Sequence, residues 1–207
     1  MKLYRDFTSQ EEIDSEYDIE NLVPNRLALI EGMAAESVRA REELDGVLDV
    51  AYGPTLDETM DIFPAARPGA PILVFIHGGY WRSFSQKEFS LVAKGPVARG
   101  ITVAVINYSL CPKVTIPEIT RQSRAAVAWM HREGLHYNGN PERLFVCGHS
   151  AGGQQAAMLA ATDWAGEYGL PPDTIKGGVA ISGIFDLAPL IYSWLQPKLL
   201  LNHEIIR

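Results

Sequence analysis

The feature that most constrains this chain is a stretch of nine residues, 145–153, in which an apolar run ends at Gly148 and turns on Ser150. Gly152 completes the pattern G-x-S-x-G. A glycine on either side of the serine allows the backbone to turn tightly, with the serine strained and its hydroxyl pointing outward. The stretch therefore predicts a strand, a nucleophilic serine and a helix in direct succession.

The residues after the turn favour a helix over residues 154–162, so the serine would sit at a helix N-terminus. Free backbone N–H groups at that end of a helix stabilise a developing negative charge. A simpler interpretation is a glycine-rich turn in which Ser150 only caps the helix. Taken alone, this stretch leaves both interpretations open.

A second stretch favours the nucleophile. Residues 71–76 form a continuous apolar run, as expected for a strand that is buried on both faces of a parallel sheet. The run is followed by His77, Gly78, Gly79, Tyr80 and Trp81. This turn, about seventy residues before the serine, is similar to the turn that completes the oxyanion hole of α/β-hydrolases. Glycines there let backbone N–H groups approach a substrate oxygen without a Cβ in the way.

Length and charge limit the other possibilities. The chain has 207 residues, 47% of them hydrophobic, which is enough for one core, so we expect a single domain over residues 1–207. Within it, we interpret residues 1–45 as an N-terminal cap segment and residues 46–207 as an incomplete hydrolase core. The net charge of -7 argues against nucleic acid and anionic membranes as partners, because both reward clustered Lys and Arg.

The N-terminal residues and the number of cysteines indicate the compartment. The N-terminal residues are polar and acidic, without an apolar leader, and no stretch is long enough to span a bilayer. Two cysteines, Cys111 and Cys147, are too few for a disulfide framework and fit a reducing compartment. We therefore expect a cytoplasmic protein.

The order of the predicted elements indicates the fold class. A helix is expected over residues 26–44, as a cap over the sheet edge, before two antiparallel edge strands over residues 46–53 and 58–63. From there strands and helices alternate, in the order 71–76, 86–99, 101–107, 116–132, 143–147, 154–162 and 175–182. The alternation predicts an α/β fold with a mostly parallel sheet, helices on both faces, and a ligand at the carboxyl ends of the strands.

After residue 182 the alternation stops, and residues 192–207 favour one more helix with no strand after it. Enzymes that present a serine on this turn place their catalytic acid and then their histidine after later strands. Two further strand–helix units, of about 30 residues each, would be needed for that order. We therefore expect the last strands, the acid and the histidine to lie beyond Arg207, in a chain that is truncated at its C-terminus.

Three stretches together carry a family resemblance. The turn at residues 77–81, the sequence Asn-Tyr-Ser-Leu-Cys-Pro at residues 107–112 and the turn at residues 148–153 resemble the kynurenine formamidase (arylformamidase) group. This group belongs to the esterase/lipase branch of the α/β-hydrolases, and the resemblance covers about residues 46–190. It implies that Ser150 is the nucleophile and that the N–H groups of Gly78, Gly79 and Ala151 hold the oxyanion.

The side chains beside these groups have supporting roles in this interpretation. Tyr80 and Trp81 lie on the turn that borders the reacting carbonyl, so we expect them to line the substrate pocket. His77 and His149 belong to the two turns, and we expect them to orient these loops by hydrogen bonds and not to transfer protons.

The other histidines offer two further hypotheses. His131 and His136 are five residues apart, a spacing that puts them on different faces of a helix, so we interpret them as surface residues and not as a metal pair. His203 follows Ser150 and could pair with Asp186 in a compact triad of the correct order. Only one strand separates the serine from both, which argues against that triad.

The resemblance implies hydrolysis of a small acyl group from an ester or an arylformamide. N-formyl-L-kynurenine, which yields kynurenine and formate in tryptophan breakdown, is the implied substrate. The alternatives are a general carboxylesterase and a non-catalytic binding protein that keeps the pocket without a working triad. We expect a small-molecule ester or amide as the ligand, no cofactor and no metal, while a homodimer is left open. The 207-residue chain itself is expected to be nearly inactive.

Overall fold

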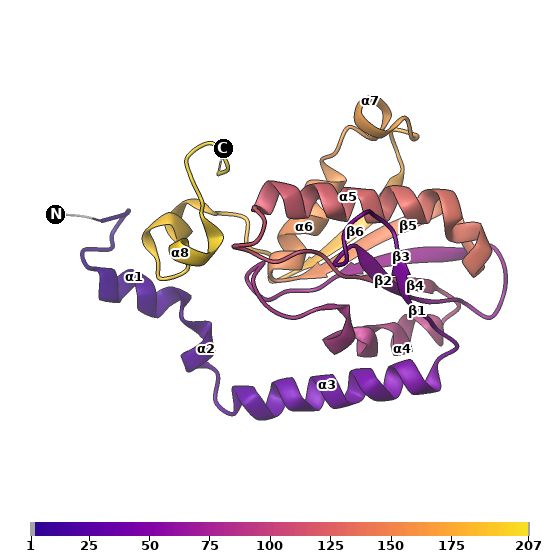
Figure 1. Cartoon of the computed structure of the whole chain (residues 1–207), viewed down its shortest axis with the longest axis horizontal. Helices are drawn as coiled ribbons and strands as arrows, with labels where there is room; N and C mark the ends of the chain where they lie inside the picture. The colour runs from indigo at the N-terminus through magenta and orange to yellow at the C-terminus, as the bar shows by residue number, and fades with distance from the viewer. Residues whose placement is uncertain (1–2, 207) are drawn as a thin grey trace.

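The computed structural model describes residues 3–206, and its centre is one six-stranded sheet with the strand order β1-β2-β4-β3-β5-β6. β3 pairs in parallel with β4 and β5, and β5 with β6, whereas β1 and β2 form an antiparallel edge beside β4. The prediction of a mostly parallel sheet is confirmed (Figure 1). The strands are β1 (Val47–Ala51), β2 (Thr59–Phe63), β3 (Ala70–Ile76), β4 (Thr102–Ile106), β5 (Gly139–His149) and β6 (Ile175–Ile181).

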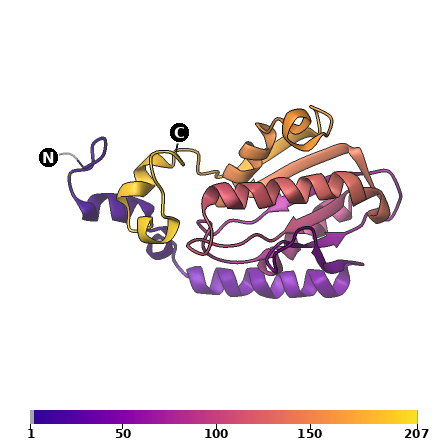
Figure 2. The ribbon, with the colours of Figure 1, turned by 45° about the horizontal axis from the view of Figure 1, so that its top comes forward.

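Helices cover both faces of the sheet because successive side chains of a strand point in opposite directions. Val74 and Ile76 of β3 belong to the buried cluster that includes side chains of α5 (Ile116–Glu133) and α6 (Ala151–Ala160). Phe75, between them, packs in a second cluster with residues of the segment that follows the strand. Figure 2 shows α5 and the long N-terminal helix α3 (Arg26–Glu43) on opposite sides of the sheet. This two-sided burial explains why the central strands are continuous apolar runs.

The prediction of a single helix over residues 86–99 is wrong. Three short elements replace it, η1 (Gln86–Glu88), η2 (Ser90–Ala93) and α4 (Lys94–Val97), of which the first two are 3₁₀-helices. Phe89 at the first junction has φ -116° and ψ 2°, outside the helical region. Pro96 lacks the N–H group that a longer helix would need at that position.

The helix predicted over residues 192–207 is also wrong within the described residues, and Arg207 lies outside them. The segment contains the end of η4 (Ala188–Tyr192) and the short helix α8 (Gln196–Leu199). Leu200 adopts a left-handed conformation, with φ 50° and ψ 39°, and this ends α8. Two short elements were not predicted, the 3₁₀-helix η3 (Gly134–Tyr137) and the helix α7 (Trp164–Tyr168).

Three helices precede the sheet, and the first two were not predicted. α1 (Gln10–Tyr17) begins with a capping box, and α2 (Ile19–Leu22) follows it. α1 lies beside α8 and η4, so the two ends of the chain meet (Figure 1). The backbone N–H of Trp194 donates to the carboxylate of Asp14 over 2.6 Å, which ties these ends together. No helix within residues 3–206 combines the length and the apolar character needed to cross a bilayer.

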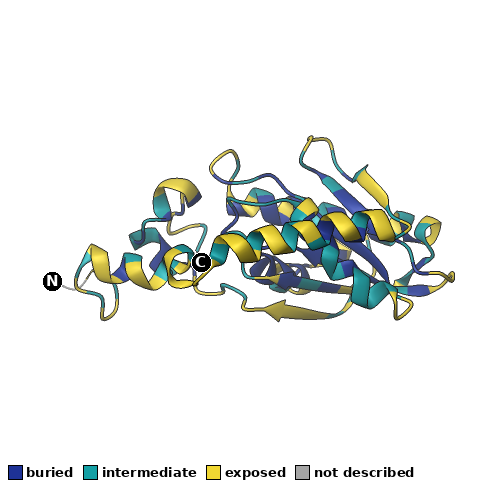
Figure 3. Cartoon of the chain, turned by 90° about the horizontal axis from the view of Figure 1, so that it is seen from below, coloured by how far each residue is buried: buried dark blue, intermediate teal, exposed yellow. Residues whose placement is uncertain are grey.

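α3 (Arg26–Glu43) matches the predicted helix, but it covers a face of the sheet and not its edge. It packs mainly on η1 and η2, and only Ser37 and Ala40 are buried (Figure 3). Its C-terminal half is anchored by Arg41, whose guanidinium lies 3.0 Å from the fully buried carboxylate of Asp61 on β2. The N-terminal half has no buried residue and borders the pocket described below.

β6 is the outermost strand on the side opposite β1, and within residues 3–206 it pairs only with β5. Its side chains Val179 and Ile181 are 59% and 46% exposed. Phe145, opposite Gly177 in the register of β5 with β6, is 37% exposed. The described chain therefore carries an apolar sheet edge with unpaired backbone groups.

Candidate active site

The turn at residues 148–152 connects β5 directly to α6 through Ser150. We call it the nucleophile turn, after the role that the sequence predicts for Ser150. This residue has φ 55° and ψ -118°, a conformation that non-glycine residues rarely adopt. A Cβ on Gly148 would overlap the carbonyl oxygen of Gly152, and a Cβ on Gly152 would overlap that of Ile76. Both flanking glycines are therefore required for the turn itself.

The side chain of Ser150 bears on the two interpretations of this residue, a nucleophile or a cap of the helix. Ser150 occupies the N-cap position of α6, but its side chain makes no capping hydrogen bond. The hydroxyl is thus free of the role that a structural cap would give it. The arrangement is that of a strained serine presented at the carboxyl end of the sheet and at the N-terminus of a ten-residue helix.

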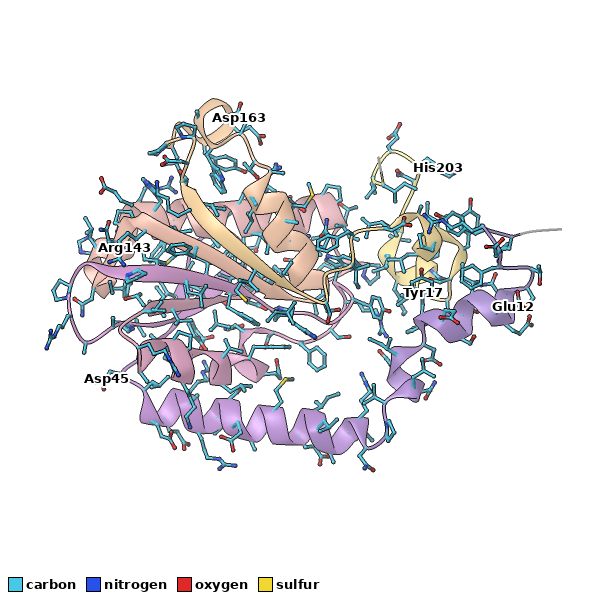
Figure 4. The ribbon with its side chains drawn as sticks, turned by 180° about the vertical axis from the view of Figure 1, so that it is seen from behind. Glu12, Tyr17, Asp45, Arg143, Asp163 and His203 are labelled. Carbon is cyan, nitrogen blue, oxygen red and sulfur yellow. The ribbon has the colours of Figure 1, made fainter. Side chains whose placement is uncertain are left out.

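The structure does not assemble the compact triad. Within residues 3–206, no side chain is hydrogen-bonded to the hydroxyl of Ser150. Asp186 instead forms an ion pair of 2.7 Å with Arg5 and accepts a hydrogen bond from the N–H of Ala188. His203 is exposed in the segment that follows α8 (Figure 4).

We call residues 77–84, which connect β3 to the segment before η1, the oxyanion turn, after the role that the sequence predicts for them. A Cβ on Gly78 would lie 3.1 Å from the Cβ of Ser150 and 2.8 Å from the carbonyl oxygen of His149. Gly78 therefore lies directly against the turn that carries Ser150. Gly79 differs, because its φ is 111° and a Cβ there would overlap the carbonyl oxygen of Ser83. The conformation of the turn therefore itself requires glycine at this position.

His77 holds the start of the oxyanion turn. Its ring is fully buried, and its Nδ1 donates a hydrogen bond of 2.8 Å to the carbonyl oxygen of Gly78. The ring stacks on that of Tyr108 with centroids 4.1 Å apart, and the Tyr108 hydroxyl donates to the His77 carbonyl oxygen. Burial lowers the pKa of His77 to about 4, so the ring is neutral near pH 7. These contacts fit an orienting role.

The aromatic residues after the glycines separate into two roles. Tyr80 lines the pocket beside Ser150, and burial raises the pKa of its hydroxyl. Trp81 does not line the pocket: its side chain is fully buried in the core. The prediction for Trp81 is therefore corrected. Its positive φ of 55° directs the side chain inward, and its carbonyl oxygen accepts the N–H of Cys111.

A pocket of about 490 Å³ opens next to Ser150. One wall is the face of the sheet with η2, and the other is formed by α2 and the N-terminal half of α3. His149, which also lines the pocket, has a pKa lowered by partial burial of its ring. The side chains that line the pocket are mostly apolar and include Ile19, Val23, Leu29, Ile30, Met33, Phe75, Phe84, Phe89, Leu91, Val92 and Ile181.

Sequence reasoning did not find this pocket wall. The sequence predicts the helix that carries Ile30 and Met33 only as a cap over the sheet edge. Their periodic spacing was the available signal, but the spacing does not reveal which element the helix faces. The wall forms only because α3 lies against the face of the sheet with its N-terminal half near Ser150. That placement depends on contacts between segments that are far apart in the sequence.

Comparison with known proteins identifies a family and several relatives of this chain. The BD-FAE family profile matches residues 60–189, which is more than half of the chain. Kynurenine formamidase from Danio rerio is 32% identical over 180 residues, covering 86% of this chain and 59% of the relative. Esterase LipQ from Mycobacterium tuberculosis is 31% identical over 172 residues, covering 77% of this chain and 40% of the relative. The chain thus spans about three fifths or less of the length of these relatives.

Solved structures agree with the fold. A crystal structure from Silicibacter sp. TM1040, whose name suggests a thioesterase, has a TM-score of 0.85 at 28% identity and covers 94% of this chain and 72% of that one. The carboxylesterase EstE1 from a metagenomic library has a TM-score of 0.59 at 20% identity, covering 79% of this chain and 56% of that one, and supports the fold alone. The chain therefore belongs to the BD-FAE family, with the α/β-hydrolase fold, and is similar to the kynurenine formamidases.

Proposed function

We propose that this chain carries the nucleophile and the oxyanion hole of a serine hydrolase that removes a small acyl group from an ester or an arylformamide. The observation that carries the proposal is the strained, uncapped Ser150 with Gly78 directly against it. The names of the relatives, formamidase and esterase, support the same class of substrate.

In the proposed reaction the hydroxyl oxygen of Ser150 attacks the carbonyl carbon, and a histidine takes the hydroxyl proton. Backbone N–H groups of Ala151, Gly78 and Gly79 hold the oxyanion, each worth about 2.7–4 kcal/mol by the usual mutational measure. The tetrahedral intermediate collapses, the leaving group departs with the proton, and water releases the acyl group from the serine in a second round. Within residues 3–206, no histidine is hydrogen-bonded to Ser150.

For the substrate we propose N-formyl-L-kynurenine, cleaved to kynurenine and formate, on the strength of the similarity to kynurenine formamidase. A general carboxylesterase is the second candidate, because the lining of the pocket is mostly apolar and a relative is named as an esterase. Formate release from N-formyl-L-kynurenine, measured beside hydrolysis of p-nitrophenyl butyrate, distinguishes the two. Turnover of the ester alone would favour the carboxylesterase.

The nucleophile is tested by labelling the full chain with a fluorophosphonate probe. Because no histidine within residues 3–206 is hydrogen-bonded to Ser150, labelling of this serine is expected to be slow, and it is expected to vanish in Ser150→Ala. Ser83→Ala is a matched control, because Ser83 also lines the pocket. His203→Ala is a second control, since His203 is exposed. Labelling that survives Ser150→Ala would place the nucleophile elsewhere, and loss of labelling in His203→Ala would restore the compact triad.

The compartment also remains a proposal. We propose the cytoplasm, because Cys111 and Cys147 are free cysteines, Cys111 buried and Cys147 half-buried, and neither forms a disulfide in the structure. Burial raises the pKa of both thiols, so they are poor nucleophiles near pH 7. Detection of the tagged chain in fractionated cells tests this proposal.

A further inference from the structure

The oxyanion turn has positive φ values at four positions and is strained at the three that are not glycine. Gly79, Tyr80, Trp81 and Phe84 have positive φ values of 111°, 49°, 55° and 73°. Three of them carry side chains that rarely accompany a left-handed backbone, and such conformations persist only where the surrounding structure holds them. The turn therefore depends on support from outside.

Arg82 connects the oxyanion turn to its neighbours. Its backbone N–H donates to the carbonyl oxygen of Gly79 over 3.0 Å and closes the turn. Its guanidinium donates to Oε1 of Glu20 over 2.5 Å and lies 5.0 Å from the centre of the Trp194 ring. The Arg82 side chain is only 19% exposed. Within residues 3–206, Glu20 is the one carboxylate paired with it.

Glu20 belongs to the segment that forms the outer wall of the pocket. It lies in α2 and also pairs with Arg26 at the start of α3, over 3.6 Å. The same segment has a second tie to the oxyanion turn, because the hydroxyl of Tyr80 donates to the carbonyl oxygen of Tyr17 over 3.3 Å. Figure 4 shows Tyr17 at the end of α1, next to α8. Two residues of the turn thus hold one short segment, residues 17–26.

We propose that Glu20 and Arg82 are positioning residues, whose ion pair uses the pocket wall to hold the oxyanion turn in its strained shape. The contacts that hold the outer wall against the pocket are then the same contacts that hold the N–H groups of Gly78 and Gly79 in place. This inference rests on the proposed function, because an oxyanion turn has a purpose only in a hydrolase.

The pair differs from an ordinary surface ion pair. Exposed pairs contribute little, whereas here the Arg82 side chain is 19% and the Glu20 side chain 34% exposed, so removal of one partner leaves a partly buried charge without its partner. Nε of Arg82 is buried and has no hydrogen-bond partner within the described chain, so the charge depends on the contact that its terminal nitrogen makes. Loss of Glu20 is therefore expected to move the Arg82 side chain, and with it the turn.

The first test reads the turn directly, by amide hydrogen exchange of the full chain. In Glu20→Gln, the amides of residues 79–84 are expected to exchange about tenfold faster, which corresponds to about 1.4 kcal/mol in an opening equilibrium. The matched control is Glu36→Gln, which breaks an exposed pair of 3.0 Å with Arg39 on α3. Unchanged exchange in Glu20→Gln, or an equal increase in the control, would overturn the proposal.

The second test reads the chemistry, as the rate at which a fluorophosphonate labels Ser150. Glu20→Gln and Arg82→Gln are each expected to slow labelling about tenfold or more, as for a misplaced catalytic geometry. The double variant is expected to be no slower than either single variant, because both remove the same pair. Arg82→Lys, which keeps the charge, is expected to retain most of the rate. Additive losses, or no rescue by lysine, would overturn the proposal.

The failure of the proposed function and the failure of the positioning role can be told apart. If Ser150 of the unaltered chain is not labelled even on long incubation, while another residue is, the proposed function fails, and the exchange experiment still decides whether the pair holds the turn. If Glu20→Gln does not fold, Arg82→Gln breaks the pair from the other side and is read in the same way. Labelling of the unaltered chain with unchanged exchange in both variants refutes the positioning role alone.

Discussion

The backbone N–H of Ser150 donates a hydrogen bond of 2.8 Å to the carbonyl oxygen of Ile181, the last residue of β6. The nucleophile turn is thus tied to the strand at the sheet edge, whose outer side is unpaired within residues 3–206. Strained residues keep their conformation only while their surroundings do. Order at the end of β6 is therefore a condition for the geometry of Ser150.

The two glycines of the oxyanion turn are expected to respond differently to substitution. Gly78→Ala should slow phosphonate labelling of Ser150 about 100-fold, because its Cβ would press on Ser150 and displace the reacting atoms. Its free energy of unfolding should fall by only about 1–3 kcal/mol, as for an overpacked side chain.

Gly79→Val should lose stability and labelling together. Its φ of 111° and the overlap with the Ser83 carbonyl oxygen oppose any side chain. Urea unfolding and labelling rates of both variants make the comparison. A Gly79→Val chain of normal stability that is only inactive would instead mean that this glycine serves substrate access.

Stability is expected to fall in mild acid because of His77. Burial lowers its pKa from an ordinary value of 6.5 to about 4, so the unfolded chain binds more protons than the folded chain between these values. The contribution of this group is present above pH 6.5, is lost as the pH falls to 4 and changes no further below that. The loss is about 3 kcal/mol at most.

The His77→Asn variant tests this assignment. Its urea unfolding, compared at pH 7 and pH 4.5, should depend on pH less steeply than that of the unaltered chain. His136→Asn is the control, because His136 is exposed. An identical pH dependence in His77→Asn and the unaltered chain would assign the acid sensitivity to other groups.

Arg41→Met is expected to lower the free energy of unfolding by about 3 kcal/mol or more, because it leaves the buried Asp61 without its cation. The hydroxyl of Ser90 and the N–H of Asp49 would still donate to Asp61, but neither carries a charge. Arg39→Met, on the exposed side of the same helix, should cost less than about 1 kcal/mol. Urea unfolding of both variants decides, and equal losses would contradict the anchoring role.

The apolar edge at β6 is expected to make the chain self-associate as its concentration rises. Val179→Lys should weaken this association, since Val179 is 59% exposed on that strand. Leu135→Lys is the control, because Leu135 is 66% exposed but lies in η3. Light scattering over a concentration series measures the effect. Equal behaviour of the two variants would show that association uses another surface.

Much of the sheet and the nucleophile turn could be predicted because their causes are local. The run at residues 71–76 is apolar at every position after its proline, which predicts a strand buried on both faces, and the glycines around Ser150 allow the tight turn that other residues would prevent. α1 was missed although its signal is present, because Ser9 and Glu12 form the capping box that begins it.

Other features depend on contacts that no local pattern contains. Tyr80 and Trp81 are neighbours in the sequence, yet one lines the pocket and the other is fully buried. Their separation depends on successive positive φ values, which the surrounding structure imposes. The pair of Glu20 with Arg82 joins residues 62 positions apart and has no sequence signature.

The weak burial of α3 has a consequence for how such a pocket can diversify. Leu29, Ile30 and Met33 shape the cavity beside Ser150, yet none of them is buried and none belongs to the main core cluster. Substitutions there can change the size of the bound group while the free energy of unfolding stays nearly constant. New substrate preferences can therefore accumulate on this helix without compensating mutations in the sheet.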